Sequence, residues 1–247
     1  MTSQVKQLIG YSINSLSYAK HCFFRILIKL AFLYLSFVHI TGCSTGSQEE
    51  CSIIEIVAPS DVISEKNIVQ FCEDYKVECE RIFNWNNHWV IYINTERAEE
   101  IENRLGESFP EQEIKTFKTP FYHFNRKEDC GKEMVVYQDH VIMTASLVEN
   151  EEMQVEYMQF HHTQREEWSE VAEGFCNADF QHVKVYRNGR QLMLVISIPK
   201  GKSLEELNPK TVENNPRVEE WNSIMSIYQE GIEDAPEGVT WIEFRKI

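Results

Sequence analysis

The chain has 247 residues, of which 43% are hydrophobic and 12% aromatic, which is enough for one large domain or two small ones with hydrophobic cores. Acidic residues outnumber basic ones by 39 to 24, and the formal net charge is −15. This balance argues against nucleic-acid binding, because contacts to phosphate need concentrated lysine and arginine. A neutral small molecule or another protein is the better-matched partner.

Residues 1–43 are predicted to be a bacterial lipoprotein signal peptide. Basic residues precede an apolar run from Leu30 to Ile40, which is too short to span a bilayer comfortably and suits a signal-peptide core. The run ends in the sequence ITGC, which resembles a lipobox. That resemblance implies a lipid on Cys43, a polar tether over residues 44–51, and a location in the bacterial envelope, either periplasmic or at the outer membrane. An uncleaved anchor is the alternative.

The seven cysteines argue against a structural metal site, because no pair has CxxC spacing. Cleavage before Cys43 would remove Cys22 and use Cys43 for the lipid, which leaves five. An exported protein can form disulfides, and an odd number leaves at least one thiol. Cys176, at the end of a predicted helix, is expected to be a small buried residue.

The first half of the mature chain, residues 52–124, is predicted to have the order β-α-β-β-α-β. Alternating apolar residues indicate strands, and helical spacing indicates two helices. The expected elements are strands at Ser52–Pro59, 78–83, Trp89–Glu96 and 113–124, and helices at Glu65–Tyr75 and Arg97–Phe109. Residues 125–139 are expected to be a polar linker.

The second half, residues 140–247, repeats this order. We expect strands at His140–Val148, Phe180–Tyr186, Gln191–Ile198 and 239–247, and helices from Glu151 to about Asn177 and from Pro216, capped by Asn215, to about Glu233. Each half is therefore predicted to be a split βαβ, ferredoxin-like unit, which makes the fold class α+β.

The hairpin of the second half predicts how the two sheets pack. A two-residue turn at Asn188-Gly189 would pair Val183 with Leu194 on a nearly all-apolar face, which needs a cover. The opposite, mixed face carries His182 and would lie beneath the helices. Two such sheets in one chain can cover each other, so we expect an internal α+β barrel.

The segment Glu156–Trp168 contains two adjacent histidines in a helical pattern. At about 100° per residue, His161 shares the sheet-facing side with Tyr157, Gln164 and Trp168, and His162 points outward. Two histidines that coordinate one metal ion from the same face of a helix are spaced three or four residues apart, so no metal site is predicted here. Burying several polar groups together costs free energy unless each finds a partner. The cluster therefore favours a cleft, and a satisfied core histidine is the alternative.

These residues resemble the L-rhamnose mutarotase family over residues 140–247. The resemblance rests on Tyr157 and His161, on the sequence WSEV from Trp168, on a polar residue at 182, and on the sequence NPRVEEW of the second helix. It implies that Tyr157 and His161 bind the sugar and donate a proton, with His161 as the donor. It also places the substrate-holding positions on His182, Trp221 and Asn222, with Gln164 and Trp168 beside them.

The departures from the family pattern are specific. His182 stands where the family has tyrosine, Asn222 where it has tryptophan, and about three extra residues lie near 163–165. The first half has no Tyr-x3-His on its helix and is expected to be a partner without a site of its own. Trp168 could equally be a plain core residue.

The function implied by the resemblance is mutarotation of a deoxyhexose such as L-rhamnose or L-fucose. The reaction needs one proton delivered to the ring oxygen and one removed from the anomeric hydroxyl, with no cofactor. The protein would be a monomer or a weak dimer. One alternative is a non-catalytic carbohydrate-binding lipoprotein, favoured by His182 and Asn222. The other is a cofactor-free oxygenase or haem-handling protein, with His161 as a base or axial ligand.

Overall fold

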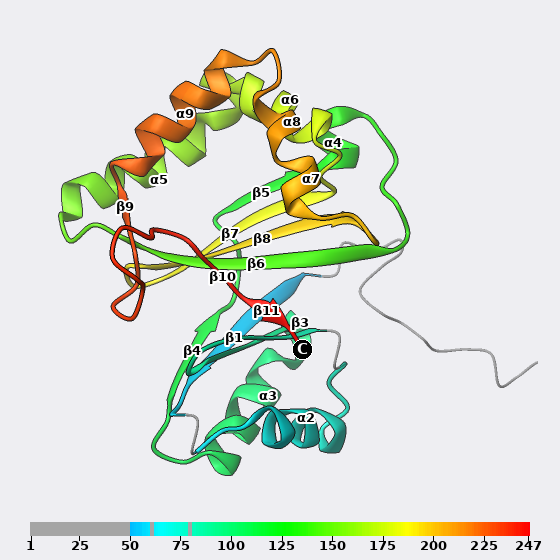
Figure 1. Cartoon of the computed structure of the whole chain (residues 1–247), viewed down its shortest axis with the longest axis vertical. Helices are drawn as coiled ribbons and strands as arrows, with labels where there is room; N and C mark the ends of the chain where they lie inside the picture. Colours follow the sequence, from blue (N-terminus) through cyan, green and yellow to red (C-terminus); the bar gives the residue numbers. More distant parts are fainter. Residues whose placement is uncertain (1–49, 60–61, 79–80) are drawn as a thin grey trace, which may run out of the picture. The chain divides into compact units, whose positions relative to one another are not determined.

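The computed structural model describes residues 50–59, 62–78 and 81–247, and in these ranges two antiparallel sheets each carry helices on one face (Figure 1). All of these residues belong to one unit, Cys43–Ile247. The predicted signal peptide, Cys43 and almost all of the predicted tether lie outside the described residues.

The first sheet has the strand order β11-β2-β3-β1-β4, of which the last four strands come from the first half. Helices α2 and α3 pack on one face through apolar residues such as Phe71, Ile101 and Leu105. The helix α2 begins where the Ser64 and Asn67 side chains form a capping box. The elements are β1 (Cys51–Val57), α2 (Glu65–Asp74), β2 (Ile82–Trp85), β3 (His88–Asn94), α3 (Thr95–Ser108) and β4 (Glu113–Phe117).

The second sheet has the order β10-β6-β8-β7-β5, with β9 also paired to β6. Helices α5, α6 and α9 lie on one face of it (Figure 1). The elements are β5 (Tyr122–Asn125), α4 (Arg126–Cys130), β6 (Gln138–Leu147), α5 (Glu151–Glu167), α6 (Ser169–Asn177), β7 (His182–Asn188), β8 (Gln191–Pro199), α7 (Leu204–Leu207), α8 (Pro209–Val212), α9 (Pro216–Ser226), β9 (Gln229–Glu230), β10 (Ile242–Glu243) and β11 (Arg245–Lys246). The fold is α+β with two tandem ferredoxin-like units, as predicted.

The two halves exchange edge strands, which the sequence did not predict. Residues 113–124 form two strands instead of one: β4 pairs with β1, and β5 pairs with β7 of the second sheet. Pro120 lies between them and has no N–H for a ladder, so the chain can change sheets there. Residues 239–247 likewise divide into β10, paired with β6, and β11, paired with β2. The expected linker also contains a short helix, α4.

The two faces of the second sheet are used in the opposite way to the prediction. Its apolar face, with Val183 and Val185, lies under the helices. Its mixed face packs on the first sheet in a shared core that includes Tyr92, Tyr186 and Met193. The mixed face finds hydrogen-bond partners there: the Tyr186 hydroxyl donates to the Cys51 carbonyl oxygen at 2.7 Å. Polar side chains therefore fit between the sheets, because the opposite sheet satisfies them.

The hairpin register and the helix ends also differ from the prediction. Asn188 pairs with Gln191, so the turn is Gly189-Arg190, and the φ of Gly189 is 58°, as two-residue hairpin turns require at that position. The register shifts by two residues, which leaves each side chain on its predicted face. The long helix of the second half is broken at Trp168 into α5 and α6.

The last helix is shorter than predicted. It ends at Ser226 instead of about Glu233, because the following residues join the edge of the sheet as β9. Asn215 precedes this helix, but its side chain makes no capping bond. Instead it donates to the Glu170 carbonyl oxygen at 2.8 Å and ties α9 to α6.

Candidate functional site

A cavity of about 360 Å³ lies between the apolar face of the second sheet and its helices. The volume falls within the usual range of small-molecule sites. Apolar side chains from β7 and β8 line one side, and polar and aromatic side chains from the helices line the other. The lining residues are Tyr122, Tyr157, His161, Gln164, Phe175, Phe180, Val183, Val185, Leu194, Ile196, Asn208, Trp221, Asn222, Met225, Ser226, Gln229, Thr240 and Trp241.

His161 lines the cavity and His162 is exposed, as the helical wheel predicts. The Nδ1 atom of His161 lies 3.0 Å from the Tyr157 carbonyl oxygen. A carbonyl oxygen only accepts, so Nδ1 carries the hydrogen and Nε2 keeps its lone pair. Burial lowers the pKa of His161 to about 4, while the bond to the Tyr157 carbonyl raises it. The imidazole is therefore neutral near pH 7.

In this state His161 is a hydrogen-bond acceptor toward the cavity, whereas the resemblance implies a proton donor. A neutral imidazole whose one N–H is held by a backbone carbonyl has no proton to give to a substrate in the first step. Its remaining nitrogen is an acceptor. His161 is therefore placed to act as a base first, and it can donate only after it has taken up a proton.

Tyr157 lies beside His161, with ring centroids 4.4 Å apart. Its hydroxyl accepts a hydrogen bond of 3.2 Å from Nε2 of Gln229. Burial raises the pKa of the Tyr157 phenol, and the Gln229 bond opposes this increase. The phenol therefore stays protonated at neutral pH and can donate its hydrogen.

Gln164 is a third polar group in the cavity wall, on the same side of α5 as Tyr157 and His161. The Tyr122 hydroxyl donates to its Oε1 atom at 2.7 Å. Because the amide oxygen is engaged, the Gln164 amide nitrogen is the end that remains to donate. Tyr122 comes from β5, so the first part of the chain does contribute one residue to the cavity.

Three of the expected substrate-binding residues line the cavity, Trp168 packs behind one of them, and His182 lies elsewhere. Trp221 and Asn222 of α9 line the cavity together with Gln164. Trp168 is buried and contacts the Trp221 ring at a centroid distance of 5.5 Å, with the Arg217 guanidinium 3.8 Å from its ring centroid. Trp168 is thus packed against Trp221 and is not one of the lining residues.

His182 is not in the cavity, which corrects the prediction. Its neighbour Val183 lines the cavity, so His182, one residue away on the strand, points to the opposite face. There its Nδ1 atom lies 3.0 Å from Nε2 of His123. The error follows from the reversed assignment of the two faces of the sheet.

The sequence did not predict Tyr122, Gln229 or Trp241 as site residues. Tyr122 was assigned to the first half. Gln229 was assigned to the last predicted helix, which in the structure ends at Ser226. Trp241 lies in an expected strand with no motif around it. The proline two residues before Tyr122 was the one usable signal for a strand that changes sheets.

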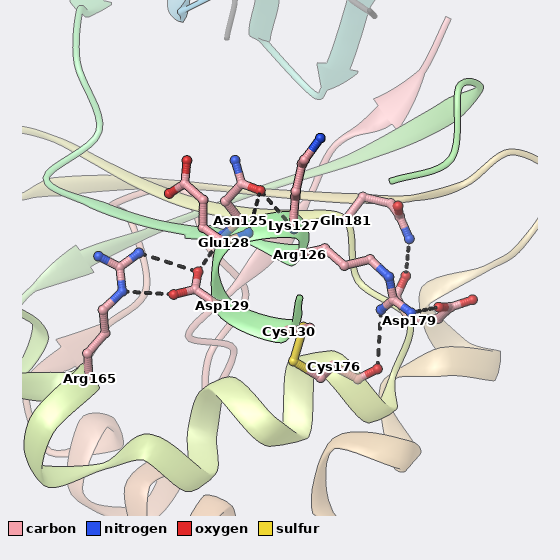
Figure 2. The surroundings of a disulfide bond; sticks show 10 residues. All are labelled: Asn125, Arg126, Lys127, Glu128, Asp129, Cys130, Arg165, Cys176, Asp179 and Gln181. Carbon is pink, nitrogen blue, oxygen red and sulfur yellow. Dashed lines mark hydrogen bonds and ion pairs between the residues drawn. A yellow bond between two sulfur atoms is a disulfide. The ribbon is translucent and has the colours of Figure 1, made fainter. Parts of the chain in front are cut away.

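A disulfide between Cys130 and Cys176 joins α4 to α6 next to the cavity (Figure 2). The sequence predicted that Cys176 is a small buried residue, and the structure shows instead that it forms a disulfide. Arg165 donates to both oxygens of Asp129, at 3.0 and 3.3 Å, and so ties α5 to α4 as well (Figure 2). Phe175 and Gln164, the neighbours of Cys176 and Arg165, line the cavity.

Within the described ranges, no three side chains of His, Cys, Asp or Glu are grouped closely enough to hold a metal ion. None of the helices in those ranges combines the length and the hydropathy needed to cross a bilayer.

The comparison with protein families bears directly on this half of the chain. Residues 141–247 match the L-rhamnose mutarotase family model. The resemblance seen in the sequence is thus confirmed for these residues, which contain α5, α9 and most of the cavity wall. The match supports a sugar mutarotase-like function. A search of the curated proteins returns no match.

Two solved structures, both from Listeria monocytogenes, show a distant likeness. One is an uncharacterised ferredoxin-fold protein related to antibiotic biosynthesis monooxygenases, with 12% identity and a TM-score of 0.41, covering 81% of this chain and 96% of that one. The other is a haem-degrading enzyme, with 12% identity and a TM-score of 0.39, covering 79% of this chain and 99% of that one. TM-scores this low carry no argument about function.

Proposed function

We propose that the cavity of the second half is the site of a cofactor-free sugar mutarotase that interconverts the α and β anomers of a deoxyhexose such as L-rhamnose or L-fucose. The observation that carries the proposal is the pairing of Tyr157 and His161 in one cavity wall, within the residues that match the family. A neutral imidazole nitrogen and a protonated phenol there supply the acceptor and the donor that the reaction needs.

The proposed reaction begins with removal of the anomeric hydroxyl proton by Nε2 of His161. The electron pair of that O–H bond forms the C1 carbonyl, and the bond from C1 to the ring oxygen breaks. The ring oxygen takes a proton from the Tyr157 phenol. Rotation about the bond between C1 and C2 presents the other aldehyde face, and the same transfers in reverse close the ring. General acid–base help of this kind contributes about 10²–10⁴-fold.

The rest of the wall suits a deoxysugar. Val183, Leu194 and Ile196 offer an apolar surface to the methyl group of a 6-deoxyhexose. Trp221 offers a flat indole face to the pyranose ring, and its centroid lies 5.3 Å from that of His161. Gln164 and Asn222 supply amide groups for sugar hydroxyls.

Saturation-transfer NMR tests the proposal. The purified protein should speed the exchange between the two anomer signals of at least one deoxyhexose above the buffer rate, and His162→Ala, which changes an exposed residue, should do so equally well. No acceleration across a panel of deoxyhexoses and common hexoses would refute the enzyme. Saturable sugar binding by calorimetry without exchange would instead support the non-catalytic binding protein.

We also propose that a lipid on Cys43 anchors the protein in a bacterial envelope, facing the periplasm or the outside. The ITGC sequence after an apolar run supports this, and so does the disulfide, because disulfides persist in exported proteins and are rare in the cytosol. Cys43→Ser should release soluble protein or stall processing. A variant that is cleaved normally and still fractionates with membranes would exclude the lipid.

A further inference from the structure

Gln229 and Trp241 lie side by side on an interrupted edge strand, although they are 12 residues apart. The strands β9 and β10 both pair with β6: Gln229 lies opposite Leu147, and Ile242 lies opposite Thr144. Continuing the register of β10 by one residue sets Trp241 opposite Ala145. Side chains two residues apart on β6 share a face, so Gln229 and Trp241 face the cavity together.

The hydrogen bonds between them fix the direction of the Gln229 amide. Nε1 of Trp241 donates to Oε1 of Gln229 at 3.1 Å. An indole N–H can only donate, so it selects the amide oxygen as its partner and leaves the amide nitrogen for the other side. That nitrogen donates to the Tyr157 hydroxyl at 3.2 Å.

The segment between β9 and β10, residues 231–241, is held in place at two points. At its base, a Cβ on Gly231 would lie 2.5 Å from the Val239 carbonyl oxygen, so the close approach needs glycine. Farther out, Asp234 lies 3.3 Å from Nε2 of His88, whose Nδ1 lies 2.9 Å from the fully buried Glu55. The first half of the chain thus holds the segment that leads to Trp241.

We propose that Gln229, oriented by Trp241, is a positioning residue that holds the phenol hydrogen of Tyr157 toward the substrate. Because Gln229 donates to the phenol oxygen, the phenol hydrogen must point away from the Gln229 amide, and Tyr157 lines the cavity that would hold the substrate. The inference rests on the mutarotase function proposed above. It adds two residues that act through Tyr157 and that lie outside the helix motif.

Replacing Gln229 by Glu tests the direction of this bond. One carboxylate oxygen still accepts from Trp241, and the other would accept the phenol hydrogen and turn it away from the substrate. We expect kcat to fall about 3- to 10-fold, the worth of one neutral hydrogen bond, with a smaller change in KM. As the pH falls and the carboxyl group protonates, it can donate again, so the ratio of variant to wild-type kcat should rise. Gln229→Met should lose activity at every pH.

The matched control is Gln159→Glu, which makes the same change at an exposed position of α5. It should leave kcat unchanged. Trp241→Phe should lower kcat less in the Gln229→Met background than in the wild type, because the orienting bond has nothing left to orient. A merely structural role for Gln229 predicts similar losses in Gln229→Glu and Gln229→Met, with no recovery at low pH.

A second measurement does not depend on activity. Protein labelled at the tyrosine ring carbon bonded to oxygen gives one NMR signal for Tyr157, identified by its loss in Tyr157→Phe. The signal should move in both Gln229 variants and stay in place in Gln159→Glu. An unmoved signal, or exchange at the wild-type kcat in both Gln229 variants, would overturn the positioning role alone. A wild-type protein without exchange on any sugar would overturn the mutarotase function and, with it, this role.

Discussion

The disulfide between Cys130 and Cys176 should account for a large part of the folding stability. The two cysteines are 46 residues apart. The loop-entropy relation for a cross-link of that length gives about 4 kcal/mol at 25 °C, arising from the restricted unfolded chain. We take this value as an upper estimate for the double variant Cys130→Ser/Cys176→Ser, because measured disulfide stabilisation is typically about 2–4 kcal/mol.

Urea unfolding of the oxidised protein and of the double variant measures the effect. The variant should lose about 2–4 kcal/mol of unfolding free energy and show a steeper dependence on urea, because its unfolded chain exposes more surface. Each single variant should lose about as much as the double variant, since either one removes the bond. Reductant should bring the wild type to the level of the double variant and leave that variant unchanged.

The local contacts predict a further effect on the site. With the bond gone, α4 is still held to α5 by Arg165 and Asp129, so the variant should fold and keep its cavity. Exchange activity per folded molecule should therefore change little, although the free energy of unfolding falls. Equal unfolding free energies and equal urea dependence for wild type and double variant would refute the reasoning, because the two thiols would then not be joined in the native protein.

Three other predictions concern titratable groups. His161→Ala should lower anomer exchange per folded molecule by about 10²–10⁴-fold, whereas His162→Ala should be fully active and within about 0.5 kcal/mol of wild-type stability in urea. Burial lowers the pKa of His161 to about 4, so kcat/KM should stay level until the pH nears 4. Burial also lowers the pKa of His140, to about 3. Stability should fall as the pH drops below about 6.5, where the unfolded chain takes up protons that the folded chain does not; a rate profile centred on 6.5 or acid-independent unfolding would contradict this. His88→Ala should cost about 3 kcal/mol in urea unfolding, because the buried Glu55 loses its ion-pair partner and keeps the hydrogen bonds from Gln191. His88→Gln, which can keep the hydrogen bond to Glu55, should cost less.

Much of the fold could be predicted because local patterns specify it. Alternating apolar residues give β1, β3 and β8, and helical spacing gives α2 and α3. The same spacing separates His161 from His162 correctly, since the two faces of a helix differ sharply in burial. These features depend only on residues close in sequence.

The features that were missed depend on residues far apart. Which face of the second sheet lies under the helices is decided by partners on the first sheet, such as Tyr92 and Cys51 for the mixed face. The pairing of Cys130 with Cys176 depends on where α4 and α6 meet. The contact between Gln229 and Trp241 depends on an edge strand that leaves the sheet and returns. No local periodicity carries such information, and reversing the faces was enough to place His182 wrongly.

The tandem arrangement leads to a last prediction, about assembly. A single ferredoxin-like unit leaves one face of its sheet bare and commonly covers it by pairing with a second copy. Here the shared core buries the centre of that face of the second sheet: Ile142, Tyr186, Met193 and Val195 are in it, together with Ile53 and Val90 of the first sheet. The exchange of β5 and β11 between the sheets also occupies an edge of each. Protein expressed without residues 1–43 should therefore be a monomer by analytical ultracentrifugation at micromolar concentration, and exchange activity per chain should not depend on concentration. A stable dimer, or activity that falls on dilution, would show that the first half does not replace the missing partner.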